Sequence, residues 1–397
     1  MSIEIRICEL EHIIRHNADP SFLGNELSYS ALSGALTYAA LAGKQQLDPD
    51  ISHLVGTDEY AASLRRTWQT LIANPAHLPC GEIHLKDFLL IGESALCVSA
   101  DHGLALVGSP LNWGIDYARW YVSQLAKRIP WLTAVDDDHF MLDDQAVTPV
   151  DETGGLLLAS PGSDIYGHWI LDYVPRLFLS QYIAEDQKQR VIFSTLPPWA
   201  RVFLDAFEIR SERLAYLDPT KLNKFSHLCM PSAVKNGFSM AQPINRQAWL
   251  YFRDYIRSKN AMRPQSDFPK FSEKIFLSRR SFGSSRVIDN ARRLEYLAKD
   301  AGYDIIEPEK FDIFTQAEIL FHAKIVLGED GSALHNVLFS QAGAHLGVIA
   351  VAERPNLWHL SLCQAMGHRL SYIVAKSDAA GIREVDEDLF KSFLKAM

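Results

Sequence analysis

Short apolar runs and amphipathic stretches alternate along the chain from about Ile83 onwards. The apolar runs are rich in β-branched residues and have the length of buried strands, at 88–91, 104–107, 156–159 and 191–194. Stretches with helical periodicity lie between them, at 117–128 and 166–183. Strands that alternate with helices are typical of βαβ units, so this part of the chain is predicted to form a parallel sheet covered by helices.

The same alternation restarts after a polar segment, residues 258–272, which contains Pro264 and Pro269 and is predicted to be an interdomain linker. Beyond it, strands are predicted at 274–278, 303–306, 324–327 and 346–351, and helices at 291–301, 314–322, 332–339 and 355–366. We expect a last helix at 384–395 to fold back over the first domain.

This pattern predicts an α/β protein with two Rossmann-like domains in tandem. The predicted parts are an N-terminal extension (1–80), a first domain (81–257), the linker (258–272), a second domain (273–380) and a C-terminal helix (381–397). The extension is expected to be partly helical, at 29–42 and 59–73. Tandem domains imply a cleft between them, and ligands of open α/β sheets bind at the carboxyl ends of strands.

Composition fits a globular protein with an acidic balance. The 397 residues suggest two or three domains, and the 48% hydrophobic and 22% charged residues exclude disordered and coiled-coil classes. The net charge of −9 disfavours binding to nucleic acid through the overall charge of the protein. The five cysteines, without a CxxC pair, predict reduced thiols and a cytoplasmic protein. No secretory signal or transmembrane segment is recognisable, so membrane contact would be peripheral, at the inner membrane face.

A histidine and a carboxylate share one helical face after the strand at 156–159. The segment reads SPGSDIYGHWILDYVPR, and in its predicted helix His168 and Asp172 lie four residues apart. Imidazole titrates near neutral pH, so the pair suits general-base chemistry, with either residue as the base. Pro175 should kink the helix, which leaves the direction of Arg176 open. The alternative is a hydrogen-bonded core histidine beside a solvated aspartate.

An arginine-rich loop follows the strand at 274–278. Arg279 and Arg280 leave this strand, Arg286 follows in a Gly/Ser loop, and Asn290 stands where the next helix should begin. Guanidinium groups bind phosphate oxygens bidentately, so the loop is a candidate diphosphate cradle in an otherwise acidic protein. The alternative is a solvated basic loop that pairs with nearby carboxylates.

A glycine-containing turn follows the strand at 324–327. Gly331 and Ser332 open the next helix, whose N–H groups and hydroxyl form a natural anion site. Glu329 and Asp330 would repel a phosphate on the loop itself, so they fit contacts to a ribose or base, or a helix cap, better. The alternative is an ordinary turn in which glycine supplies a positive φ.

Several nucleotide-binding and hydrolase motifs are absent from the sequence. There is no GxGxxG, no P-loop and no GxSxG elbow. Three consecutive acids, Asp136–Asp138, follow an apolar run and resemble the DxD motif that holds a divalent cation and a nucleotide-sugar diphosphate. Such a run is more often an exposed turn.

Taken together, the three segments resemble glycosyltransferase family 61, once labelled a capsular-polysaccharide biosynthesis domain. The resemblance covers about residues 156–375 and rests on Tyr166-Gly167-His168-Trp169, Asp172 and Pro175-Arg176; on Ser278-Arg279, Arg286 and Asn290; and on Gly328, Gly331-Ser332, Leu334 and Asn336. The chain departs from the family where many members have histidine in place of Asp330, acids in place of Ala291-Arg292-Arg293, and a glutamate near 349–351, where this chain has only Glu353 nearby.

The resemblance implies a GT-B-like fold with two Rossmann-like domains facing a central cleft. It implies inverting transfer of a sugar from a nucleotide-sugar donor, held by the C-terminal domain, to a hydroxyl of a polysaccharide or glycolipid acceptor, held by the N-terminal one. The family role is surface or capsular polysaccharide biosynthesis, and no metal or other cofactor is expected.

The same resemblance suggests roles for the residues of the three segments. His168 or Asp172 would deprotonate the acceptor hydroxyl, and Arg279 and Arg286 would stabilise the departing nucleoside diphosphate together with the helix start at 331–332. His335 and Asn336 would be further donor contacts; the secondary candidates are Tyr166, Arg176 and Asp330.

Three other functions stay open at this stage. One is a pyruvyl or glycosyl-phosphate transfer on the same scaffold. Another is a catalytically degenerate relative that binds sugar or nucleotide without turnover, for which the departures at Asp330 and Ala291 argue. The last is a metal-dependent transferase that uses Asp136–Asp138.

Overall fold

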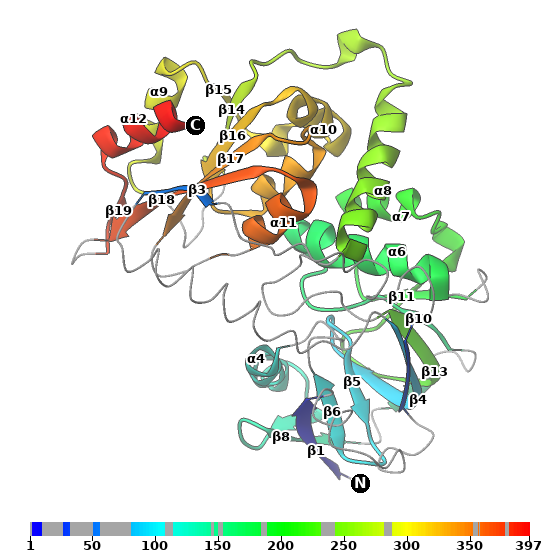
Figure 1. Ribbon diagram of the computed structural model, residues 1–397. Coiled ribbons are helices and arrows are strands. Elements are labelled where there is room, and N and C mark those ends of the chain that lie inside the picture. Colours follow the sequence, from blue (N-terminus) through cyan, green and yellow to red (C-terminus); the bar gives the residue numbers. More distant parts are fainter. Residues whose placement is uncertain are drawn as a thin grey trace. The chain divides into compact units, whose positions relative to one another are not determined.

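The computed structural model contains two compact α/β units (Figure 1). The first consists of the described residues within 1–43 and 77–235, and the second of those within 44–76 and 236–397. The structure describes residues 2–9, 27–31, 51–55, 81–107, 114–143, 147–149, 154–183, 189–231, 243–281, 288–351, 356, 358–377 and 381–397. Each unit has its own sheet and its own helices, which confirms the predicted α/β class.

The second unit is built on a seven-stranded sheet in which six strands pair parallel, five of them from the C-terminal half of the chain. In chain order these are β14 (Lys274–Leu277), β15 (Asp304–Ile306), β16 (Ile325–Glu329), β17 (His345–Val351) and β18 (Arg369–Ser377). They lie in the order β15-β14-β16-β17-β18, and β18 also pairs with β3 (Ile51–Val55) and β19 (Arg383–Glu384). This is a doubly wound order, and it reverses between β14 and β16.

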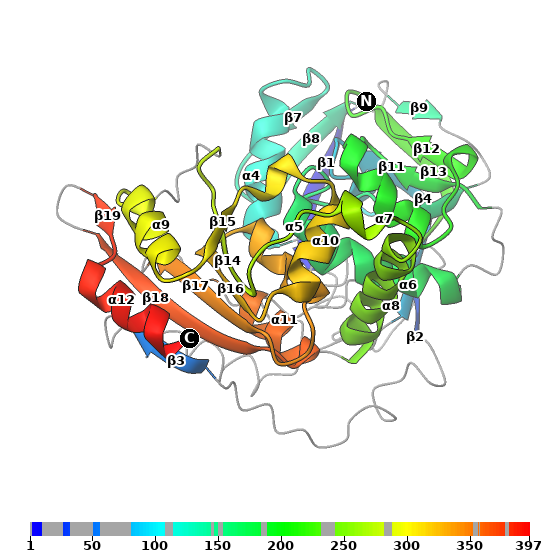
Figure 2. The ribbon, with the colours of Figure 1, turned by 90° about the horizontal axis from the view of Figure 1, so that it is seen from above.

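Helices cover both faces of this sheet (Figure 2). One face carries α9 (Ala291–Asp300) and α12 (Glu387–Ala396), and the other carries α8 (Pro243–Asn260), α10 (Ile313–His322), α11 (Trp358–Met366) and the 3₁₀ helix η9 (Ser332–Phe339). Short 3₁₀ turns, η7 (Gln265–Asp267) and η8 (Pro308–Lys310), complete the unit. Because both faces are covered, the central strands read as continuous apolar runs, which is why the sequence pattern located them.

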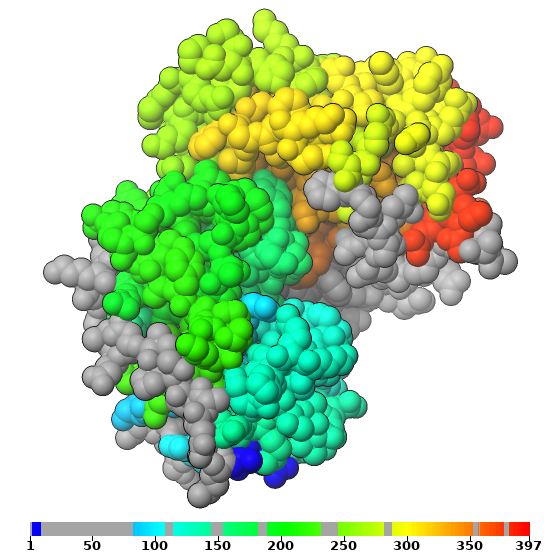
Figure 3. Space-filling model, turned by 180° about the vertical axis from the view of Figure 1, so that it is seen from behind, coloured from blue at the N-terminus to red at the C-terminus, as the bar shows by residue number. Residues whose placement is uncertain are grey.

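The C-terminal helix packs within the second unit, whereas we expected it to fold back over the first domain. Phe390 and Phe393 enter the same apolar core as Leu294 of α9. The segment between β19 and α12 is fixed as well, because the Asn290 side-chain amide donates to the Val385 carbonyl and accepts from the Val385 N–H. Figure 3 shows the outer side of α12, in red, beside α9, in yellow.

The first unit is built on a twelve-stranded mixed sheet. Its strands are β1 (Ser2–Glu9), β2 (Leu27–Ala31), β4 (Gly81–Ile91), β5 (Leu96–Ser99), β6 (Leu104–Val107), β7 (Leu132–Ala134), β8 (His139–Asp143), β9 (Val147–Pro149), β10 (Gly155–Leu157), β11 (Val191–Phe193), β12 (Leu214–Tyr216) and β13 (Leu222–Pro231). Ten of them run in the order β12-β11-β10-β13-β4-β5-β6-β1-β8-β7, while β2 pairs with β4 and β9 with β13.

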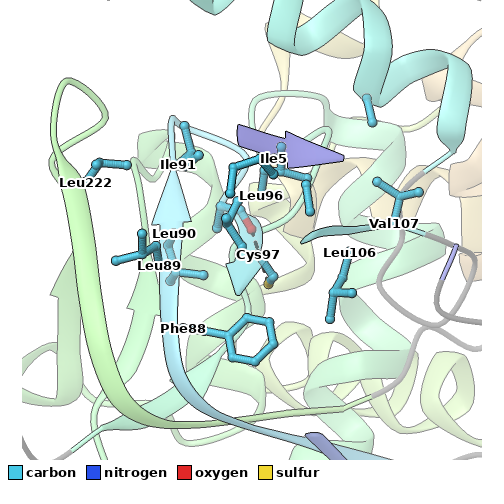
Figure 4. Close-up of a cluster of buried hydrophobic side chains, with 14 of the residues drawn as sticks. Ile5, Phe88, Leu89, Leu90, Ile91, Leu96, Cys97, Leu106, Val107 and Leu222 are labelled. Atoms are coloured by element: carbon cyan, nitrogen blue, oxygen red, sulfur yellow. Dashed lines mark hydrogen bonds between the residues drawn. The ribbon is translucent and has the colours of Figure 1, made fainter. Parts of the chain in front are cut away.

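Four α-helices, one π turn and two 3₁₀ turns accompany this sheet in the described part of the unit. They are α4 (Ile115–Ala126), α5 (Tyr166–His168), the π turn η4 (Trp169–Tyr173), α6 (Val174–Ile183), η5 (Pro198–Ala200), α7 (Arg201–Ala206) and η6 (Ser211–Arg213). The core at the β4–β6 end is mostly aliphatic with a few aromatic side chains: Figure 4 shows Ile5, Leu96 and Leu106 together with Phe88 among its buried residues.

The predicted parallel sheet is wrong for residues 81–107. There β4, β5 and β6 pair antiparallel. The connections at 92–95 and 100–103 are too short for a crossover helix, so each strand must return beside its predecessor. Gly92 and Gly103 adopt φ of 68° and 62° in these turns, a conformation that glycine tolerates without strain. Parallel pairing does occur further on, among β10, β11, β12 and β13.

The boundaries between the units also differ from the expected ones. The first unit ends at 235, so α8 belongs to the second unit, not to the first domain. Within the expected linker, Phe268 is buried and the Arg263 guanidinium lies 4.6 Å from its ring centroid. Strands β1 and β3 of the expected extension join the two different sheets. A helix was expected from Tyr29, yet 29–31 belong to β2; residues 32–42 and 59–73 lie outside the described residues.

Acid should destabilise the second unit through a buried histidine. Burial, with the positive charge of Arg253 as a second cause, lowers the pKa of His368 to about 4. As pH falls from 6.5 towards 4, the unfolded chain takes up a proton that the native imidazole does not, so stability is lost, by roughly 3 kcal/mol in total. In urea titrations at pH 7 and pH 4, His368→Gln should remove most of this loss. Equal losses in this variant and wild type would contradict the assignment, and the exposed His322→Gln serves as the control.

Candidate active site

The first predicted segment forms a compact turn at the carboxyl end of β10. The strand runs into residues 158–165, and α5 then begins at Tyr166. Gly162 has φ of 84°, and a Cβ on it would come within 2.5 Å of the His168 ring. Glycine is therefore required here twice, for the backbone conformation and for the close approach of the imidazole.

His168 and Asp172 form a hydrogen-bonded pair, as their spacing predicts. His168 Nδ1 lies 2.5 Å from Asp172 Oδ2. The aspartate side chain is 1% exposed, whereas that of the histidine is 36% exposed. An ionised carboxylate can only accept, so Nδ1 carries the proton and Nε2 of the neutral ring keeps its lone pair. The pair thus has one ring nitrogen that the aspartate does not occupy, Nε2 of His168, on a partly exposed side chain.

A π turn places this pair. Residues 169–173 are π-helical, and the Val174 N–H donates to the Trp169 carbonyl five residues earlier. Pro175 lacks an N–H and would leave the carbonyl four residues before it unbonded in a regular helix, so a wider turn just before it is a natural accommodation. The sequence predicts a kink at this proline, and the structure has a π turn just before it. The Trp169 indole N–H, which donates to the Ser163 carbonyl at 2.8 Å, ties the π turn back to the loop.

Arg176 lies inside the protein and fixes the strand ends. Its side chain is fully buried, and its guanidinium donates to the carbonyls of Leu157, Leu158 and Pro231 and to the Ser160 hydroxyl. Burial lowers the pKa of Arg176. These contacts join β10 and β13 to α6, so Arg176 has a structural role here. Tyr166, the other secondary candidate in this segment, stacks edge-on against Trp199 and Phe203.

The second and third segments meet where the strand order of the second unit reverses. Leu277 of β14 pairs with Gly328 of β16, so the residues that follow both strands are neighbours. There the Arg279 guanidinium donates to the Asp330 carbonyl. A Cβ on Gly331 would lie 2.7 Å from Arg279 Nη1, so this glycine makes room for the guanidinium. Ligands of doubly wound sheets bind at this position.

The two arginines after β14 have different partners. Arg280 forms an ion pair with the buried Glu295 of α9, and Glu295 also accepts from the Ser278 hydroxyl at 2.5 Å. This pair matches the solvated-loop alternative for Arg280, whereas Arg279 stays on the Gly331 turn. Arg286 lies outside the described residues.

The two acids at the end of β16, Glu329 and Asp330, are buried. Burial raises the pKa of Glu329, and the hydrogen bond from the Ile288 N–H and the charge of Arg279 oppose this rise. Asp330 Oδ1 accepts from the Asn356 amide at 2.7 Å and from His359 Nε2 at 2.9 Å. The Asp330 side chain therefore connects the turn to Asn356 and to His359 of α11.

The remaining predicted donor residues divide between the surface and the interior. Ser332 is partly exposed at the start of η9. His335 and Asn336 are buried: the His335 ring packs 4.9 Å from that of His359, and the Asn336 amide donates to Gln316 of α10 at 2.6 Å. Asn336 thus joins η9 to α10.

The acidic run Asp136–Asp138 forms a turn before β8. Asp136 accepts from the backbone N–H groups of Asp138 and His139 and contacts the His139 ring, and Asp138 accepts from Arg119. These contacts match the alternative of an exposed turn.

The sequence did not point to three residues that contact the predicted segments: Glu295, which binds Arg280, and Asn356 and His359, which bind the Asp330 side chain. Glu295 carried a weak signal, because it follows Leu294 on the core-facing side of α9. His359 carried none, since only the tertiary fold brings it to Asp330.

Residues 166–347 match the family model described as Glycosyltransferase 61. The chain carries a glycosyltransferase 61 domain. This confirms the resemblance of the three segments, and the matched region contains the His168–Asp172 pair, Arg279 and the Gly331 turn. The domain is that of an enzyme that takes a donor and an acceptor substrate. Comparison with curated proteins gives no match.

Two further findings concern membrane-spanning helices and disulfides. Among the described residues, no helix has both the length and the apolarity needed to cross a bilayer. The four cysteines that the structure describes form no disulfide: Cys8, Cys97, Cys229 and Cys363.

Proposed function

We propose that this glycosyltransferase is an inverting, metal-independent enzyme with a GT-B-like scaffold. It moves a sugar from a nucleotide-sugar donor to a hydroxyl of a polysaccharide or glycolipid acceptor in the synthesis of a surface polysaccharide. The observation that carries the proposal is an accessible imidazole held on a buried carboxylate, inside the region that matches the family. The donor would bind the second unit, whose sheet is doubly wound, and the acceptor the first.

In this proposal His168 is the general base. Its Nε2 takes the proton of the acceptor hydroxyl while the hydroxyl oxygen attacks the anomeric carbon and the bond to the diphosphate breaks. The resulting imidazolium is stabilised by Asp172, which lies 2.5 Å from Nδ1. Asp172 is too deeply buried to reach the acceptor, so the geometry favours the histidine over the aspartate as the base.

Arg279 stabilises the leaving nucleoside diphosphate in this proposal. A guanidinium has five N–H donors in a fixed plane, and the Gly331 turn positions it at the carboxyl edge of the doubly wound sheet. The negative charge that develops on the diphosphate would be neutralised by this arginine and by the N–H groups at the start of η9. Arg286 is a second proposed phosphate ligand on the evidence of the sequence alone.

Calorimetry with a panel of nucleoside diphosphates and nucleotide sugars tests the donor site. We expect one nucleotide base to bind and to raise the melting temperature by mass action. No binding of any nucleotide would contradict the proposal. Binding without turnover in the presence of acceptors would instead favour the catalytically degenerate alternative.

Chelation should leave sugar transfer intact. If Arg279 replaces a divalent cation at the diphosphate, the rate measured with donor and acceptor should change less than about twofold after EDTA treatment. A metal-dependent mechanism predicts loss with EDTA and recovery with Mg²⁺ or Mn²⁺. That result would contradict metal independence and favour the metal-dependent alternative that uses Asp136–Asp138.

A further inference from the structure

Two strands of the first unit bring a mixed set of metal-binding side chains together. Strands β4 and β13 pair antiparallel, with Cys229 directly opposite His84. Ile83 of β4 points into the apolar core, so its neighbours Glu82 and His84 face the other side of the sheet. His227, two residues before Cys229, belongs to the same face.

The ligand atoms of three of these residues converge. His84 Nε2 lies 3.3 Å from Glu82 Oε1, and Cys229 Sγ lies 3.7 Å from Glu82 Oε2. All three residues offer ligand atoms within 4.8 Å of one another. A tetrahedral Zn²⁺ with bonds of about 2.0–2.3 Å separates its ligand atoms by about 3.3–3.8 Å. The two separations, each to a different oxygen of Glu82, are similar in length to these ligand–ligand distances.

His227 has the position of an outer partner of this site. Its Nε2 lies 3.3 Å from His84 Nδ1, the ring nitrogen that faces away from Glu82. A proton on Nδ1, donated to His227, leaves the lone pair on His84 Nε2, where a metal would need it. Metal-bound histidines commonly use their second nitrogen in this way, and the two rings here also stack with centroids 5.5 Å apart.

We propose that Glu82, His84 and Cys229 bind a divalent transition metal, Zn²⁺ by the chemistry of their donors, and that His227 orients His84 from outside. Thiolate, imidazole and carboxylate together suit zinc, whereas magnesium and calcium prefer oxygen ligands alone. Three protein ligands leave a fourth position for water. Cys229 is 4% exposed as a whole residue, whereas Glu82 and His84 are partly exposed, so two of the three residues are reachable from solvent. None of these residues takes part in the proposed sugar transfer.

Metal binding to the full-length, untagged chain tests the proposal directly. After removal of metals with a chelator, equilibrium dialysis should give one tightly bound Zn²⁺ per chain. Titration with Co²⁺ should give the intense near-ultraviolet absorption of a cobalt–thiolate bond, displaced by Zn²⁺. Substoichiometric zinc, or cobalt bound without that absorption, would overturn the proposal. This measurement needs no variant. Because it does not depend on enzymatic activity, its result tests the metal site independently of the proposed function.

Variants assign the ligands. Cys229→Ser and His84→Ala should each raise the Kd for Zn²⁺ by more than about 100-fold, and His227→Ala should raise it by about 10–100-fold. Cys8→Ser, on β1 of the same sheet, and His139→Gln, beside Asp136, should bind zinc like the wild type. Melting curves without metal show whether each variant is folded. Wild-type affinity in folded Cys229→Ser would exclude the site.

Discussion

Replacing His168 by alanine should lower kcat for sugar transfer by about 10²–10⁴-fold and leave the Kd of the donor unchanged. The side chain supplies the basic ring nitrogen of the pair, and its loss leaves only water to accept the acceptor's proton. The fold should tolerate the change, because the ring is 36% exposed and alanine only vacates the space beside Gly162. Single-turnover rates and calorimetric donor binding measure the two quantities separately.

Asp172→Asn should lower kcat to a similar extent by a different route. The amide is neutral, so it cannot stabilise the imidazolium that forms as the proton moves, and it can donate to Nδ1 and reverse the tautomer. The rate of the variant should therefore fall at every pH at which the wild type is active. His322→Ala is a matched control for the loss of a paired histidine. His322 Nε2 lies 3.2 Å from the carboxylate of Glu318, four residues earlier, but the His322 side chain is 59% exposed, and the variant should keep wild-type activity. Full activity of both pair variants would show that another group is the base.

The sequence located most of the second unit because its strands are buried on both faces. Apolar runs such as 274–277 and 345–351 stand out between amphipathic helices, and the alternation of strands and helices predicts their parallel pairing. The pairing of β3 with β18 has no such signal, because it joins segments more than 300 residues apart. In the first unit, the hairpin turns at 92–95 and 100–103 carried a signal in Gly92 and Gly103. The parallel interpretation gave these turns too little weight.

For the candidate site, too, the sequence predicts local contacts but not which residues the tertiary fold buries. Spacing alone brought His168 and Asp172 together, since residues four apart share a helix face. The choice between them depends on burial, which the tertiary fold decides. Arg176 in α6 and Arg279 just after β14 are the same residue type, yet Arg176 is buried against carbonyl groups and Arg279 lies partly exposed on the turn. Local sequence does not separate these two environments.

The Gly331 turn and Arg279 should act as one unit in donor binding. Arg279→Ala should raise the Kd of the nucleoside diphosphate by about 100-fold, the loss expected for charge-assisted hydrogen bonds to phosphate. Gly331→Ala should weaken binding too, by at least about tenfold, because its Cβ would lie 2.7 Å from Arg279 Nη1 and the guanidinium has to move. Gly331 has φ of 171°, an extended conformation open to alanine, so the effect would come from the displaced side chain.

A double variant separates this coupling from two independent effects. If Gly331→Ala acts only by displacing Arg279, adding it to Arg279→Ala should weaken binding no further, so the two losses would not add. Additive losses would mean that the turn contacts the donor by itself. Gly114→Ala is the control, because nothing lies within 4 Å of its added Cβ, and its donor affinity should equal that of the wild type. Wild-type affinity in Arg279→Ala itself would place the diphosphate elsewhere, since an arginine that contributes no binding energy cannot stabilise the leaving group.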